Sequence, residues 1–516
     1  GSAQAPHVVA FTFTRQAASE LRRRMTSYGV DREVVAGTFH SVAYRILRRR
    51  WEDRGRAEPP SLAANRVGVL SEQLEGDRRM AGIAATEIEW ARARLVAPAE
   101  YATSAMGAGR RPNAPLDRVA EVYRAYEAYK RRKRILDFDD LLSESIVELQ
   151  RPGAADAVAW WHRHLHVDEF QDINPLQHAF LTTLRHGGTD LFVVGDPAQA
   201  IYGWNGADPG LLEQIQEGEL RPVVVRLPTN FRSAPPVVAA ADRVLAANRI
   251  PGEHIAAREG GARVITVAGE DELVEAQHIV ALAAQLREPG APWRSVAVLA
   301  RTHELLRQLA VAFRHAGIPT TTVTRRGADP SARQAEFIRE ARRARDGDDL
   351  HAWAVDLAWP VGADGRDTAE GEGADWRLAA HAVRAFERAG GGSGKAFVAW
   401  AELNDLDAGP GVDAVELVTM HASKGREWPA VIVAGVDTGG FPAPAAVRSP
   451  VRAEEARLLY VALTRAVDRL AITWSLRRNG VPVRRSPLLP TFDGGDSFDK
   501  GDEGDRAPIP LVRALR

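Results

Sequence analysis

The amino-acid sequence predicts an α/β protein built on two parallel sheets. Short runs of β-branched and apolar residues end in polar residues, and a helical pattern follows most of them. The runs also fall into two clusters, which separate near residues 232–260. Continuous apolar runs that alternate with helices are typical of parallel sheets covered on both faces. Each cluster therefore predicts one α/β domain.

The strands of each domain can be named by their residue ranges. The first domain is expected to contain strands at 8–13, 165–170, 191–196 and 223–227. The second is expected to contain strands at 264–268, 296–300, 430–436 and 470–474.

Helical stretches interrupt both predicted domains. The expected order is a first α/β domain at 1–50 and 136–232 with a helical insertion at 51–135, a second α/β domain at 233–325 and 413–480 with a shorter insertion at 326–412, and a loose tail at 481–516. Within the second insertion, the Gly-Gly-Gly-Ser-Gly run at 390–394 is typical of a flexible joint.

The composition excludes several classes of function. The 516 residues are 45% hydrophobic and 26% charged, as in globular proteins with a sizeable core. The absence of cysteine excludes disulfide scaffolds, zinc fingers, iron–sulfur clusters and cysteine nucleophiles. No run approaches the roughly 18 apolar residues of a membrane helix, and the first residues do not form a signal peptide. A cytoplasmic protein without a membrane partner is expected. Its net charge of −1 leaves any nucleic-acid contact to local patches.

Two adjacent carboxylates follow a predicted strand of the first domain. Asp168 and Glu169 stand at its carboxyl end, within the box Asp-Glu-Phe-Gln-Asp. In a phosphoryl-transfer site, the first carboxylate can hold Mg²⁺ through its water shell and the second can deprotonate the attacking water. The alternative is a solvated acidic turn.

Further candidates follow the next strands. Gln199 lies just beyond a strand, where it could sense a terminal phosphate, and Tyr202 and Trp204 could stack on bases or serve as core aromatics. Phe231 and Arg232 pair a ring with a cation after the fourth strand.

A late arginine suggests a role for the second domain. Arg465 ends a helical pattern, and an arginine from a second α/β domain can stabilise transition-state charge in nucleotide motors. The alternative is a solvated helix charge.

In order along the chain, these motifs resemble the UvrD/Rep/PcrA helicases of superfamily 1. The resemblance covers about residues 8 to 475, and the segments Ile-Glu-Trp-Ala at 88–91 and Leu-Asp-Phe-Asp-Asp-Leu at 136–141 resemble the second UvrD-type helicase of actinobacteria. The motifs that carry it are Thr-Phe-Thr, Thr-Phe-His, Asp-Glu-Phe-Gln-Asp, Gly-Asp-Pro-Ala-Gln, Asn-Phe-Arg-Ser, His-Ala-Ser-Lys-Gly and Tyr-Val-Ala-Leu-Thr-Arg-Ala.

The resemblance implies two RecA-like P-loop NTPase domains with ATP and Mg²⁺ as cofactors. It implies that Asp168 serves the metal, that Glu169 is the catalytic base, and that Gln199, Arg232 and Arg465 contact the γ-phosphate. The nucleotide would also be held by Phe231, Glu427 and Gly425.

The same resemblance implies single-stranded DNA and duplex junctions as partners. The implied DNA contacts are Phe13, Thr14, Thr38, His40, Tyr202, Trp204, Thr419 and His421. The implied activity is ATP-driven 3′→5′ translocation and duplex unwinding in DNA repair or replication restart.

One motif of the family is absent. Nothing reads Gly-x-x-x-x-Gly-Lys-Ser/Thr, the loop whose amides cradle phosphates. The run at 390–395 is followed by Ala396, where the hydroxyl belongs. We expect the loop to lie upstream of Gly1 in an incomplete chain; a degenerate homologue is the alternative. The competing function is a non-catalytic protein that binds single-stranded DNA. An unrelated P-loop enzyme such as a kinase would leave the DNA motifs of both domains unexplained.

Overall fold

The computed structural model describes residues 7–29, 34–55, 60–63, 66–154, 162–185, 189–218, 221–323, 383, 386, 394–403, 413–443 and 451–491. Contacts divide the chain into two compact units. The first comprises residues 1–197, 202–222 and 330–409, and the second comprises residues 198–201, 223–329 and 410–516. Both are α/β with parallel sheets, so the predicted fold class is confirmed.

The first unit contains a four-stranded parallel sheet in the order β2-β1-β5-β6. The strands are β1 (Val8–Thr12), β2 (Val35–Thr38), β5 (His164–Val167) and β6 (Asp190–Val193). β2 was not predicted from the sequence, because four residues that include a glycine give little apolar signal. Since the strands are parallel, their carboxyl ends meet at one edge of the sheet.

Helices pack on this sheet through aromatic residues. The rings of Phe11 on β1 and Phe39 on α2 stack at 4.7 Å, and Phe180 on α9 meets Phe11 edge-on. Capping boxes begin two of the helices, with Asp137 before α7 and Asn174 before α9. The helices that belong to this sheet domain are α1 (Arg15–Ser27), α2 (Phe39–Asp53), α7 (Phe138–Leu149), α9 (Pro175–Leu184), α10 (Gly210–Glu217) and α17 (Gly394–Leu403).

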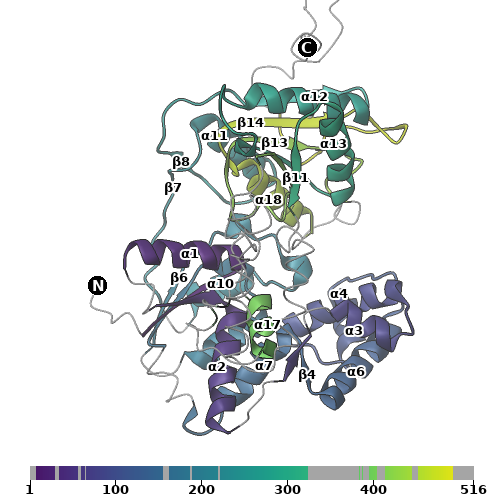
Figure 1. Ribbon diagram of the computed structural model, residues 1–516. Helices are drawn as coiled ribbons and strands as arrows, with labels where there is room; N and C mark the ends of the chain where they lie inside the picture. Colours follow the sequence, from purple (N-terminus) through teal and green to yellow (C-terminus); the bar gives the residue numbers. More distant parts are fainter. Residues whose placement is uncertain are drawn as a thin grey trace, which may run out of the picture. The chain divides into compact units, whose positions relative to one another are not determined.

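A helical subdomain is inserted between β2 and β5, and its helices α3, α4 and α6 group together in Figure 1. Its elements are β3 (Ser61–Leu62), α3 (Arg66–Gln73), α4 (Arg78–Ala93), α5 (Tyr101–Gly107), α6 (Leu116–Lys133) and β4 (Ile135–Leu136). It has a core of its own, in which Ile88, Tyr101 and Tyr126 are fully buried. The subdomain is therefore a separately packed part of the first unit.

The second unit contains a six-stranded parallel sheet in the order β11-β12-β10-β13-β14-β9. Every residue of the central strand β10 is fully buried, as expected for a strand covered on both faces. The strands are β9 (Ile265–Gly269), β10 (Val296–Ala300), β11 (Thr320–Val323), β12 (Val415–Thr419), β13 (Trp428–Ala434) and β14 (Ala466–Ser475). β11 and β12 were missed because they are short and partly polar.

Four helices accompany the second sheet, and smaller strand pairs flank it. The helices are α11 (Pro235–Ala247), α12 (Glu272–Leu286), α13 (His303–His315) and α18 (Val451–Leu463). The short pairs are β7 (Thr229–Asn230) with β8 (Ile255–Ala256), and β15 (Arg477–Arg478) with β16 (Val481–Pro482). None of the helices in the described ranges is long and apolar enough to cross a membrane.

The structure corrects two expectations. Residues 223–227 form no strand: Val223 is 92% exposed and Val225 is 73% exposed, because no described strand pairs with this apolar run. The expected loose tail is packed over 481–491, where Leu488 is fully buried and the Ser486 N–H donates to the carbonyl of Val436.

Some expectations fall outside the described residues. These include most of the predicted second insertion, the glycine run at 390–393 and the tail beyond 491. Of that insertion, α17 is described, and Ala399 on it joins the core of the first unit.

Candidate functional site

The predicted carboxylate pair lies where β5 ends. The Asp168 N–H donates to the carbonyl of Phe11 on β1 at 3.0 Å, so the sheet fixes the start of this turn. Glu169 then adopts a left-handed backbone, with φ 54° and ψ 43°. Residues other than glycine rarely adopt this conformation, which clusters at functional sites where surrounding contacts maintain it. As a result, an exposed carboxylate and a half-buried carboxylate stand side by side at the strand end.

Gln171, which the sequence analysis did not single out, holds Glu169 in place. Its Nε2 donates to Glu169 Oε2 at 2.6 Å, and its Oε1 accepts from the Asp196 N–H at 2.9 Å. A side chain on Gly195 would lie 2.9 Å from the same Oε1, so a larger residue there would displace the Gln171 amide. Gln171 is fully buried and ties the ends of β5 and β6 together. Its place in the acidic box was visible in the sequence, but its burial was not.

In the second unit, backbone pairing brings three predicted segments together. The Trp428 N–H donates to the carbonyl of Arg465, and the Ala234 N–H donates to that of Val467. This places Arg232 beside Glu427, and their side chains form an ion pair. Both are partly exposed, and such pairs contribute only about 0–1 kcal/mol. Either partner could therefore exchange the other for a ligand at little cost.

Arg465 is not the solvated helix charge considered as an alternative. Helix α18 ends at Leu463, and Arg465 follows it with only 2% exposure. Its Nε donates to the carbonyl of Val461 at 2.9 Å, and its Nη1 donates to that of Arg426 at 3.3 Å. Because these carbonyls bind the guanidinium on two sides, the position of its charge is fixed.

Gln199 contacts this arginine. Residues 198–201 group with the second unit, and Arg465 Nη2 lies 3.4 Å from Gln199 Oε1. The buried Lys424 donates to the backbone carbonyl of Gln199 at 2.7 Å. The predicted phosphate sensor therefore lies next to one of the two predicted phosphate-binding arginines.

The two remaining nucleotide candidates are Phe231, which offers an exposed ring, and Gly425, which has a left-handed backbone conformation. Phe231 is 77% exposed, so its ring is accessible to a planar ligand. Gly425 has φ 80°, a left-handed conformation that favours glycine, although a side chain there would meet no other atom within 4 Å. Glycine is thus needed at 425 for its backbone conformation.

The aromatic DNA candidates of the first unit are a stacked pair, half-buried Phe13 with buried Tyr202, and the exposed ring of Trp204. Phe13 and Tyr202 stack with centroids 5.0 Å apart and an angle of 20° between their planes. Tyr202 is 5% exposed, whereas Trp204 is 41% exposed. Of these rings, Trp204 is the most accessible to a base.

Other DNA candidates of the first unit begin helices. Thr14 Oγ1 accepts from the Ala17 N–H at the start of α1, and Thr38 Oγ1 accepts from the Ser41 N–H at the start of α2. His40 contacts the ring of Phe138 edge-on, and burial lowers the pKa of His40, which favours its neutral form. These residues follow β1 and β2, at the same edge of the sheet as the carboxylates.

Thr419 and His421 belong to the second unit. Thr419 is buried at the end of β12, and its hydroxyl accepts from the Ala422 N–H at 3.3 Å. His421 is half-buried in the turn that follows.

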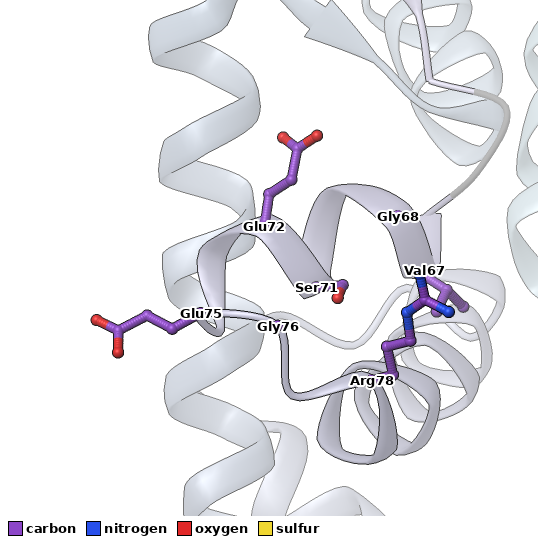
Figure 2. A pocket seen from close by; sticks show the side chains of 7 residues that line it. All are labelled: Val67, Gly68, Ser71, Glu72, Glu75, Gly76 and Arg78. Carbon is purple, nitrogen blue, oxygen red and sulfur yellow. The ribbon is translucent and has the colours of Figure 1, made fainter.

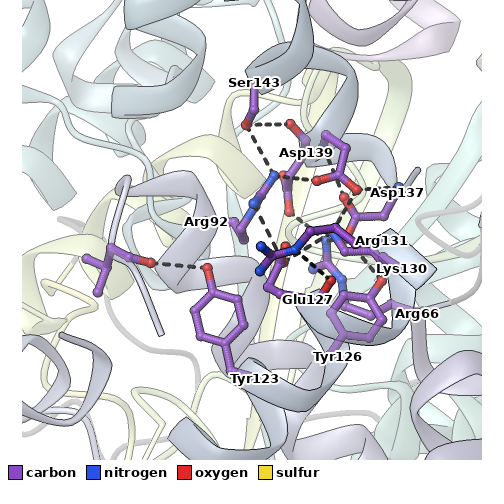
Figure 3. A network of polar contacts seen from close by, with 12 residues as sticks. Arg66, Arg92, Tyr123, Tyr126, Glu127, Lys130, Arg131, Asp137, Asp139 and Ser143 are labelled. Atoms are coloured by element: carbon purple, nitrogen blue, oxygen red, sulfur yellow. Dashed lines mark hydrogen bonds and ion pairs between the residues drawn. The ribbon is translucent and has the colours of Figure 1, made fainter. Parts of the chain in front are cut away.

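A buried charge network joins helices α4 and α6 of the insertion to the start of α7 (Figure 3). Lys130 Nζ contacts Asp137 at 3.0 Å and Asp140 at 2.6 Å, and Arg92 contacts Asp140 at 2.7 Å. Arg66 also binds Asp137, at 3.1 Å. Nearby cations hold the pKa of Asp137 well below its usual range, although burial opposes this shift. None of these residues was among the predicted site residues.

None of the predicted site residues lines the pocket in Figure 2. It has a volume of about 610 Å³ and lies between α3 and the start of α4. Its lining consists of Val67, Gly68, Ser71, Glu72, Glu75, Gly76 and Arg78. Within the described ranges, no group of three or more histidine, aspartate or glutamate side chains is arranged to hold a metal.

Two α/β units with parallel sheets, one of which has a carboxylate pair at a strand end, fit the helicase class that the motifs predict. Family comparison agrees with this class. The UvrD/REP helicase N-terminal domain matches residues 1–218, and the UvrD-like helicase C-terminal domain matches residues 225–327 and 396–477. The chain belongs to the UvrD/Rep helicase family, as its motifs predicted.

Individual relatives match the chain over different shares of their length. The chain is 34% identical to a protein of Mycobacterium tuberculosis named ATP-dependent DNA helicase UvrD2, over 93% of this chain and 73% of the relative. It is 32% identical to ATP-dependent DNA helicase PcrA of Leuconostoc citreum, over 61% of this chain and 43% of that protein. The identity to PcrA of Bacillus subtilis is 25%, over 90% of this chain and 76% of the relative.

Proposed function

We propose that this protein is an ATP-dependent DNA helicase that moves 3′→5′ on single-stranded DNA and unwinds duplex junctions in DNA repair or replication restart. One observation carries the proposal: the left-handed turn after β5, in which Gln171 holds the carboxylate of Glu169 beside the exposed Asp168. Family membership and the names of the relatives support ATP as the energy source and DNA as the substrate.

The carboxylates suit Mg²⁺ and the attacking water. Mg²⁺ usually takes one or two protein carboxylates and fills its other positions with water and substrate phosphates. Asp168 offers one such carboxylate, and the bound ion would neutralise charge on the ATP phosphates. Glu169 would accept the proton of the attacking water, because Gln171 keeps its carboxylate at a fixed position.

The arginines would act on the terminal phosphate. Arg465 is fixed by backbone carbonyls beside Gln199, and Arg232 can leave its exposed partner Glu427. Charge that is already in place stabilises a transition state without further reorganisation. Phe231 would stack on the adenine, while Glu427 and Gly425 would help to hold the nucleotide.

The DNA track would combine stacking rings with polar side chains. Stacking contributes about 1–3 kcal/mol per base and tolerates any sequence, as a translocating motor requires. We assign Trp204 the main stacking role, with Phe13 and Tyr202 supporting it. The other proposed contacts are Thr14, Thr38, His40, Thr419 and His421.

A second candidate function follows from the missing phosphate loop. The printed sequence contains no Gly-x-x-x-x-Gly-Lys-Ser/Thr run, the motif whose backbone amides usually cradle the phosphates. A non-catalytic protein would still bind single-stranded DNA through the same rings.

The deciding experiment measures ATP hydrolysis and DNA binding by the same 516-residue chain. Phosphate release is followed with and without oligothymidylate, and DNA affinity is measured with and without ATP and Mg²⁺. Hydrolysis that the oligonucleotide stimulates would support the helicase proposal, and it would mean that these residues bind the phosphates without the usual loop. Tight DNA binding that is indifferent to ATP, without hydrolysis, would support the second candidate instead. An absence of DNA binding would contradict both.

A further inference from the structure

The turn that carries Trp204 connects two parts of the first unit. It spans residues 202–208, which we call the Trp204 turn, and it is closed by hydrogen bonds from the Asn205 N–H to the carbonyl of Tyr202 and from the Gly206 N–H to that of Gly203. At its end, the Asp208 N–H donates to the carbonyl of Ile173 at 3.0 Å, directly after the acidic box. One side of the turn is therefore attached to the segment that carries Glu169.

The other side of the turn rests on helix α4 of the helical insertion. Gly206 has φ 95°, and a side chain there would lie 2.6 Å from Ala93 Cβ and 3.4 Å from the Trp90 carbonyl oxygen. No larger residue could approach α4 this closely. Glycine thus meets two requirements at this position, a left-handed backbone and direct contact with the helix.

Arg110 links the insertion to Trp204 itself. Its Nε and Nη2 bind the two carboxylate oxygens of Glu87 on α4 at 2.8 and 2.6 Å, while its Nη1 lies 3.4 Å from the backbone carbonyl of Trp204. The guanidinium also lies over the ring of Trp90, 4.7 Å from its centroid. Glu87 is buried and accepts a further hydrogen bond from the Tyr101 hydroxyl at 2.6 Å. The guanidinium is therefore held rigidly as it reaches the turn.

We propose that Arg110 is a positioning residue for the DNA contact of Trp204, through which the helical insertion sets the position of the stacking ring. This inference rests on the proposed function, because it requires Trp204 to stack on DNA. The planar fork of arginine can bind one carboxylate with two nitrogens and still direct a third at a carbonyl. Lysine, with a single ammonium group, cannot make all three contacts at once.

The test compares Arg110→Lys with the unchanged chain by fluorescence anisotropy of labelled oligothymidylate. Lysine keeps a positive charge beside Glu87, so the insertion retains its ion pair, but the contact with the Trp204 carbonyl is lost. We expect the dissociation constant to rise about fivefold. This loss of affinity corresponds to part of the free energy that stacking of one base contributes. Arg111→Ala is the matched control: it removes an exposed neighbouring arginine, and we expect unchanged affinity.

Salt dependence separates positioning from direct phosphate binding. If Arg110 contacted a DNA phosphate, removal of its charge in Arg110→Met would reduce the slope of log affinity against log salt by about 0.7, the value for one phosphate of a single strand. A positioning role predicts weaker binding with an unchanged slope, so a reduced slope overturns the inference. Gly206→Ala provides an independent variant, because it pushes the turn off α4 and leaves Arg110 intact. It should weaken DNA binding in the same way, and unchanged binding would contradict the inference.

Trp204→Ala distinguishes a failure of this inference from a failure of the proposed function. If this variant binds DNA as well as the unchanged chain, the proposed stacking role is wrong, and the inference falls with it. If Trp204→Ala weakens binding and Arg110→Lys does not, only the inference is wrong. If both weaken it, the double variant should bind no more weakly than Trp204→Ala alone, since Arg110 acts through that ring.

Discussion

Replacing Lys130 by methionine is expected to lower the free energy of unfolding by about 3–5 kcal/mol, the usual effect of removing one partner from a buried ion pair. Lys130 is 3% exposed, and its ammonium group contacts Asp137, Asp140 and Glu127 within 3.1 Å. Methionine fills similar space but leaves the carboxylates short of one positive charge. Urea unfolding followed by circular dichroism measures the change.

Lys133→Met is the control, because Lys133 lies exposed near the end of the same helix. A surface substitution of this kind usually changes stability by less than about 0.5 kcal/mol. If Lys130→Met and Lys133→Met unfold at the same urea concentration, the charge network does not stabilise the fold as described.

The decrease in the free energy of unfolding caused by Lys130→Met should also depend on pH. Burial and the neighbouring carboxylate of Asp137 raise the pKa of Asp140 to about 6. Because this folded-state pKa lies above the ordinary value, the contribution of Asp140 to stability is present at low pH and is lost as pH rises through about 6. Without Lys130 its pKa should rise further. The loss of stability in Lys130→Met should therefore be smaller at about pH 5, where Asp140 is protonated, than at about pH 8.

Glu169→Gln is expected to reduce DNA-stimulated ATP hydrolysis by a factor of about 10²–10⁴, the contribution of a positioned general base. Glutamine has the same shape but does not accept a proton from water. The residue does not belong to the proposed DNA track, so affinity for oligothymidylate should stay unchanged. Phosphate release and anisotropy on the same preparation measure the two effects.

Glu144→Gln controls for the change of charge. Glu144 is exposed on α7, and its replacement should leave hydrolysis unchanged. Retained turnover in Glu169→Gln would mean that another group activates the water. A loss of DNA binding in the same variant would mean that the turn after β5 also shapes the DNA track.

Much of the fold was readable from local patterns. β10 was predicted at its observed bounds, because a run of apolar β-branched residues covered on both faces gives a continuous signal. The run at 223–227 is also apolar and β-branched, but it forms no strand. A strand needs a second strand to pair with, and a local sequence pattern does not show whether one is present. β2, β11 and β12 are short and partly polar, so they depend on their neighbours for pairing.

For the candidate site too, some features follow from the sequence and others only from the tertiary structure. The sequence by itself determined the family and the identity of the candidate residues, because Asp168, Glu169 and Arg465 stand in contiguous motifs of distinctive chemistry. Only the tertiary structure decided that Arg465 is buried against backbone carbonyls, that Gln171 holds Glu169, and that Arg110 reaches Trp204 across 94 positions. Burial and contact between distant residues arise when the elements pack, and no local run of residues encodes them.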